Sequence, residues 1–119
     1  MDRHEMQSRT KQFALRIFRL CEALPQSTAG WAIGKQIVRS AMSVGANYRA
    51  AGRARSDAEF LAKLGIVEEE ADETCYWLEL IVESELVKPG LVQPLLAEAN
   101  ELVAIVVTMR KSVKKRIGR

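Results

Sequence analysis

Apolar residues recur along the first half of the chain with the spacing of helices that bury one face. Over residues 8–24 apolar side chains return every three or four positions, and Pro25 ends the pattern. A second pattern of this kind covers residues 28–53 and starts at Thr28, a residue type that favours the N-cap position. The spacing therefore predicts two amphipathic helices joined by a short turn.

A third and longer helix is predicted over residues 57–86. Ser56 followed by Glu59 has the spacing of a capping box, in which the serine oxygen and the glutamate side chain bind free backbone amides at a helix start. Apolar residues then repeat every seven positions over about three heptads, with no helix breaker until Pro89. We expect this segment to be the longest helix.

A fourth helix is predicted over residues 94–116, with Pro94 in the first turn, where proline is tolerated. Residues 103–107 are rich in β-branched side chains and are also compatible with a strand. A single strand after three helices would have no partner, so the helix is preferred.

Four helices with short connections favour antiparallel neighbours. A chain of 119 residues is long enough for one hydrophobic core. We therefore predict an all-α protein whose residues 1–119 form one domain, an antiparallel four-helix bundle with up-down-up-down topology.

The sequence shows no sign of a membrane segment, a secretory signal or a metal-binding motif. It contains no run of 18 apolar residues and no apolar stretch near its start. We expect a cytoplasmic protein without membrane contact. Cys21 and Cys75 are isolated, and His4 is the only histidine, so we expect buried free thiols and no metal or other cofactor.

Charges are sorted along the chain, although the net charge is only +3. Residues 1–55 carry ten basic and three acidic side chains, residues 56–105 carry two and twelve, and residues 106–119 carry six basic and none acidic. Either the segments neutralise each other in the fold, or one end presents a basic surface to a polyanion. Both explanations fit the sequence.

Two motifs in the predicted second and third helices resemble the four-helix bundle protein family. The first is Arg39-Ser40 followed by Ser-Val-Gly-Ala-Asn at residues 43–47, and the second is Glu-Thr-Cys-Tyr-Trp-Leu-Glu-Leu at residues 73–80. The family includes proteins encoded in intervening sequences of bacterial large-subunit ribosomal RNA genes, and the accessory protein of diversity-generating retroelements. The first and fourth helices match by pattern only.

The resemblance implies a homopentamer, in which five bundles form a ring. It also implies binding of RNA or DNA, because the retroelement relative binds nucleic acid and a reverse transcriptase. Ala50 stands where relatives often have a glutamate, so no role of that carboxylate is carried over.

Three polar residues of the second helix, Ser40, Ser43 and Asn47, form a stripe beside the interior glycine Gly45. We expect the stripe to pair with the third helix and to fix the register of the bundle, with ligand binding as the alternative. A glycine inside a helix costs about 1 kcal/mol relative to alanine, so Gly45 indicates close approach of another backbone.

The acidic run over residues 68–73 has three interpretations. A di-metal site is disfavoured, because such sites need carboxylates from all four helices and Glu-x-x-His pairs. The run is either a solvated face or one half of a contact between subunits. Adjacent aromatics at 76 and 77 cannot both face the core, and Trp77 is the candidate for the contact. The candidate interface residues are Lys35, Arg39, Arg49, Arg53, Glu69, Asp72, Glu73 and Trp77.

The basic tail is the strongest indication of a polyanionic partner. Its cations could bind phosphates without sequence preference, and copies in a ring would add avidity. Alternatively, they only complement the helix dipole and solubilise the end. The tail consists of Arg110, Lys111, Lys114, Lys115, Arg116 and Arg119.

Catalytic chemistry is not expected, because the sequence offers no histidine base in the folded part, no glycine-rich phosphate loop and no activated nucleophile. Two functions remain. The first is an oligomeric accessory protein that binds nucleic acid through its basic surfaces. The second is a protein-interaction scaffold without a nucleic-acid role.

Overall fold

The computed structural model describes residues 1–118, which contain four α-helices and no strand. The molecule is elongated, with extents of 48 × 22 × 19 Å. The helices are α1 (Arg3–Glu22), α2 (Thr28–Ala51), α3 (Asp57–Glu83) and α4 (Pro89–Arg116).

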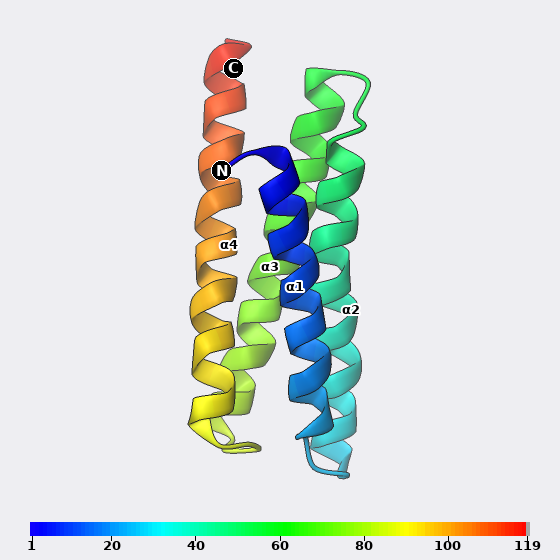
Figure 1. Cartoon of the computed structure of the whole chain (residues 1–119), viewed down its shortest axis with the longest axis vertical. Coiled ribbons are helices and arrows are strands. Elements are labelled where there is room, and N and C mark those ends of the chain that lie inside the picture. The colour runs from blue at the N-terminus through cyan, green and yellow to red at the C-terminus, as the bar shows by residue number, and fades with distance from the viewer. Residues whose placement is uncertain (119) are drawn as a thin grey trace.

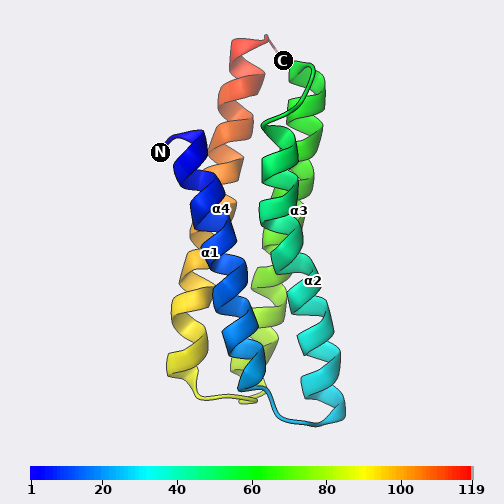
Figure 2. The ribbon, with the colours of Figure 1, turned by 45° about the vertical axis from the view of Figure 1, so that its right-hand side comes forward.

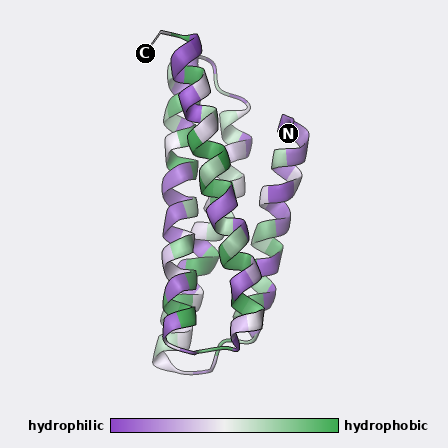
Figure 3. Cartoon of the chain, turned by 90° about the vertical axis from the view of Figure 1, so that its left-hand side faces the viewer, coloured by the Kyte–Doolittle hydropathy of each residue, from purple (hydrophilic) through white to green (hydrophobic). Residues whose placement is uncertain are grey.

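Consecutive helices lie side by side, and the chain reverses direction at each connection (Figures 1 and 2). Each helix packs against two others: α1 and α3 both contact α2 and α4. The contact between α1 and α4 is the smallest of the four. The amino-terminal end of α1 leans away from the other helices (Figure 3).

The core is built from one apolar face of each helix, which explains the spacing seen in the sequence. The largest fully buried side chains come from all four helices: Met6, Phe13, Ile17, Ile37, Val44, Leu64, Val67, Leu78, Ile81, Val92, Leu102 and Val106.

The structure corrects the predicted start of α1 and the predicted ends of the first three helices. α1 begins at Arg3 instead of residue 8, because the Asp2 carboxylate caps it by accepting a hydrogen bond of 2.8 Å from the Glu5 amide. α1 and α2 each end two residues early, at Glu22 and Ala51. α3 ends at Glu83 instead of residue 86, since Glu85 has a φ of 55°, a left-handed conformation that terminates helices.

The start of α4 is also corrected, from residue 94 to Pro89. Pro89 occupies the first-turn position that the sequence assigned to Pro94, and Pro94 lies inside the helix. Pro94 lacks the N–H that would bind the Gly90 carbonyl, and both residues are exposed, so water can satisfy that oxygen.

Two buried hydroxyl groups connect α2 and α3. Ser40 and Thr74 are both fully buried, and their Oγ atoms are 2.8 Å apart. Each also bonds a carbonyl of its own helix, Ile37 for Ser40 and Glu70 for Thr74. Because a one-residue slip would separate the two hydroxyls inside the core, the pair favours one register of α2 on α3.

By length and composition alone, α4 could cross a membrane. The core helix of a water-soluble protein passes the same test. α4 contributes six buried residues to the core and carries Glu98, which binds an arginine of α1.

The small contact between α1 and α4 is reinforced by an ion pair. Arg9 Nε and one Nη each lie 2.7 Å from a different oxygen of Glu98, and Glu101 is 3.2 Å from the same Nη. The Glu98 side chain is only 14% exposed. The hydrogen bonds from Arg9 lower the pKa of the Glu98 carboxyl below its usual range, against the opposing effect of burial.

We expect this pair to make stability depend on pH. A carboxylate whose pKa is lowered by folding stabilises the protein above the unfolded pKa, about 4.3, and loses that contribution as pH falls through the folded pKa. Denaturant titrations between about pH 6 and pH 3 should show a smaller fall in unfolding free energy for Glu98→Gln than for the parent. Equal pH slopes for the two proteins would show that the pair contributes nothing.

Two glycines of α2, one turn apart, should respond oppositely to alanine. A Cβ on the buried Gly30 would collide with the Pro25 carbonyl oxygen, whereas a Cβ on Gly34 would make an ordinary 3.6 Å contact with Leu24 Cδ1. Gly30→Ala should lower the unfolding free energy by about 1–3 kcal/mol, as overpacking does. Gly34→Ala should raise it by up to about 1 kcal/mol through helix propensity. Urea titrations followed by circular dichroism measure both, and a stabilised Gly30→Ala protein would contradict the packing.

Candidate functional site

The structure divides the basic tail into paired arginines and free lysines. Arg110 Nη1 is 2.8 Å from Glu68, and Arg116 Nη2 is 3.0 Å from Asp57. Lys111, Lys114 and Lys115 are exposed, and their spacing places them within one outward-facing sector of α4. Arg119 lies outside the described residues.

Arg110 has a structural position. Its guanidinium group lies between α4 and α3, 3.7–3.8 Å from the point where a Cβ on Gly65 would sit. A Cβ there would make only an ordinary van der Waals contact, and the guanidinium passes beside Gly65 to reach Glu68. Lys111, Lys114 and Lys115 are the exposed tail cations that form no ion pair within residues 1–118.

Other segments bring further cations to the same end of the molecule. The α2–α3 connection and the carboxyl end of α4 lie together there, and the amino end of α1 points the same way (Figure 1). Figure 3 shows hydrophilic residues at this end of α1 and α4. We define the basic end as the exposed residues Arg3, Arg53, Arg55, Lys111, Lys114 and Lys115.

Part of the expected subunit interface is used within the chain. Arg39 of α2 forms ion pairs with Glu70, at 3.2 Å, and with Glu73 of α3. Trp77 Nε1 donates a hydrogen bond of 3.0 Å to the same Glu73 carboxylate. Arg39, Glu73 and Trp77 therefore join α2 to α3, and this network neutralises part of the acidic run.

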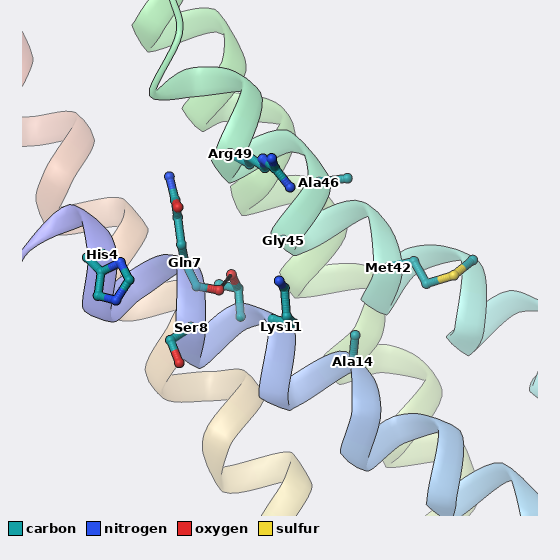
Figure 4. Close-up of a pocket in the computed structure, with 10 residues that line it drawn as sticks. His4, Gln7, Ser8, Lys11, Ala14, Met42, Gly45, Ala46 and Arg49 are labelled. Atoms are coloured by element: carbon teal, nitrogen blue, oxygen red, sulfur yellow. Dashed lines mark hydrogen bonds between the residues drawn. The ribbon is translucent and has the colours of Figure 1, made fainter.

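The remaining interface candidates are exposed. Lys35 lies on α2, Arg53 lies in the α2–α3 connection, and Glu69 and Asp72 lie on α3. Arg49 of α2 projects toward the space between α1 and α2 (Figure 4).

Exposed apolar side chains were missed by the sequence reasoning. Tyr76 is 54% exposed and packs edge-on against Trp77, so Tyr76 is the outward aromatic of the pair. Trp31 of α2 is 63% exposed, and Met42 and Ile66 are also exposed. Helical periodicity could have indicated a shared face for two of them, because residues 11 positions apart, such as Trp31 and Met42, lie on the same side of a helix.

The other two residues of the polar stripe stay within α2. Asn47 Nδ2 donates a 2.9 Å hydrogen bond to the Ser43 carbonyl, so only Ser40 reaches α3. The nearby Gly45 faces α1, where a Cβ would be 3.3 Å from Thr10 Oγ1 and 3.5 Å from its carbonyl carbon. Close approach of another backbone therefore accounts for this glycine.

Within residues 1–118, no three His, Cys, Asp or Glu side chains are grouped so that they could hold a metal ion. Cys21 and Cys75 are free thiols. Burial raises the pKa of the Cys75 thiol to about 11, so this group stays protonated near neutral pH and is a poor nucleophile.

The fold and the surface define an all-α protein of four packed helices with a basic end. Residues 2–108 match the family of 23S rRNA-intervening sequence proteins, and the chain belongs to that family. No curated protein matches the chain.

A solved structure supports the same assignment. It is a protein of unknown function from the S23 ribosomal protein family of Bacteroides thetaiotaomicron. The two proteins are 34% identical, with a TM-score of 0.82, and the match covers 89% of this chain and 98% of the other.

Proposed function

We propose that this protein is a non-enzymatic accessory protein that binds nucleic-acid phosphates through its basic end. The observation that carries the proposal is that three separate segments bring exposed cations to one end, where Lys111, Lys114 and Lys115 make no ion pair within residues 1–118. Lysine and arginine side chains release counterions when they bind phosphates, without reading sequence. The family name makes RNA the first nucleic acid to test.

Point substitutions test the basic end more sharply than deletion of the tail, which would also remove Arg110 and the buried Val113. Lys114→Gln/Lys115→Gln should weaken RNA binding. It should also reduce the slope of log affinity against log salt by about 0.7–0.9 for each phosphate that the variant no longer neutralises. Fluorescence anisotropy at about 50 and 200 mM salt measures both effects.

Arg19→Gln/Lys88→Gln is the matched control, because it removes the same charge from exposed positions near the opposite end of the molecule. It should leave the salt slope close to that of the parent. Absence of binding at low salt, or binding that ignores salt, would refute the proposal.

We also propose that the up-down-up-down bundle assembles into a homopentameric ring. A closed ring uses two different surfaces on each subunit. One suitable surface is the outer face of α2, with Lys35 and the exposed Trp31, together with Arg53 of the following connection. The other is the outer face of α3, with Glu69 and Asp72 beside Tyr76. Opposite charges around exposed apolar groups favour contact between these faces.

The assembly can be tested by mass. Native mass spectrometry or light scattering at micromolar concentration should give five times the 13.3 kDa mass of the chain. Tyr76→Ala should lower the oligomeric mass, because it removes an exposed aromatic contact from the proposed interface without changing its charge. If the parent protein is a monomer at this concentration, the ring proposal is wrong, and no avidity from five copies can contribute to binding.

The exposed apolar side chains favour one alternative function, a protein-interaction scaffold without a nucleic-acid role. The two functions differ in the salt experiment. A pentamer that does not bind RNA at low salt would support the scaffold.

A further inference from the structure

A groove of about 410 Å³ lies between α1 and α2, on a part of the surface outside the basic end. It lies between residues 4–14 of α1 and residues 42–49 of α2 (Figure 4). Its volume falls in the range of small-molecule sites. The basic end does not include its lining residues, and the outer face of α2 proposed for the ring adjoins it at Met42.

The floor of the groove is made by small residues. Ala14 of α1 and Gly45 and Ala46 of α2 line it, and α1 and α2 approach closely where Gly45 faces Thr10. Larger side chains at these positions would fill the space. The depth of the groove therefore depends on residues that the sequence keeps small.

One half of the groove is cationic. His4, Lys11 and Arg49 line it, together with the polar side chains of Gln7 and Ser8, and none of its lining residues is acidic. Figure 4 shows Gln7 and Lys11 of α1 and Arg49 of α2 projecting toward the space between the two helices. Lys11 and Arg49 form no ion pair within the described chain. Basic side chains that face the same groove attract an anion, and arginine favours phosphate.

The other half of the groove is apolar. Because α1 and α2 run in opposite directions, His4 lies toward the Arg49 end, while Ala14 lies toward Met42. The Met42 side chain is 47% exposed, and a thioether makes favourable contacts with aromatic rings. A ligand matching both halves carries a phosphate at one end and a flat, apolar ring system at the other.

We propose that the α1–α2 groove binds one nucleoside monophosphate unit, with the phosphate between Lys11 and Arg49 and the base against Met42 and Ala14. The unit is either a free nucleotide or the terminal nucleotide of a strand. No residue of the basic end lines this site, so this proposal can be tested independently of the function proposed above.

The test uses AMP and the full-length protein in the oligomeric state in which it purifies. Methyl NMR should show a shift of the Met42 signal on addition of AMP, and calorimetry should give its affinity. Lys11→Gln/Arg49→Gln should weaken AMP binding at least tenfold. Arg19→Gln/Lys88→Gln, which removes two exposed cations outside the groove and outside the faces proposed for the ring, should leave it within twofold.

A second variant fills the groove without changing charge. Ala46→Leu adds a larger side chain at an exposed position that lines the groove, so it should abolish the AMP effect while circular dichroism shows an intact fold. No Met42 shift with AMP, or equal weakening by the two double substitutions, would overturn the proposal. Competition by inorganic phosphate as strong as by AMP itself would also overturn it, because the apolar half would then contribute nothing.

Two further measurements identify the source of the ligand and distinguish binding in the groove from binding at the basic end. Competition by a 5′-phosphorylated single-stranded oligonucleotide would support a strand terminus, and binding of AMP without such competition would support a free nucleotide. Lys114→Gln/Lys115→Gln should leave AMP binding unchanged. If that variant alone removed AMP binding, the nucleotide would sit on the basic end and the groove proposal would be wrong.

Discussion

Arginines join the four helices at the surface of the apolar core by neutralising carboxylates of neighbouring helices. Carboxylates crowded along one helix repel each other unless cations lie close to them. Arg39 of α2 and Arg110 of α4 reach the acidic run of α3, and Arg9 of α1 reaches Glu98 of α4. Every ion pair between helices in residues 1–118 uses an arginine, consistent with the planar, multidentate guanidinium group.

This use of arginine leaves the lysines free for other contacts. Arg110 and Lys111 are neighbours in sequence, yet the first is held against Glu68 and the second is exposed. The two positions differ by about 100° around the helix axis, so one faces α3 and the other faces away. A tail that looks uniformly basic therefore combines arginines paired within the fold and lysines that are exposed and make no ion pair within residues 1–118.

The four helices could be predicted because burying one face imposes a periodicity that a single sequence displays. Helix starts were less predictable, since they depend on single caps: Asp2 extends α1, and Pro89 takes the role assigned to Pro94. Arg39, Glu73 and Trp77 looked like interface residues, but their pairing depends on the relative rotation of α2 and α3, which no local pattern specifies. The α1–α2 groove is lined by side chains of two helices that are distant in the sequence, so no local motif indicates it.

The weak attachment of α1 has a consequence for dynamics. α2, α3 and α4 share the larger contacts, whereas α1 has its smallest contact with α4 and its amino-terminal end leans outward. Backbone amides of α1 should therefore exchange with solvent through local opening at a lower free energy than amides of α2 and α3. Any molecule that bridges α1 and α2 would slow this opening, so slower exchange in α1 alone would report occupancy of that side of the protein.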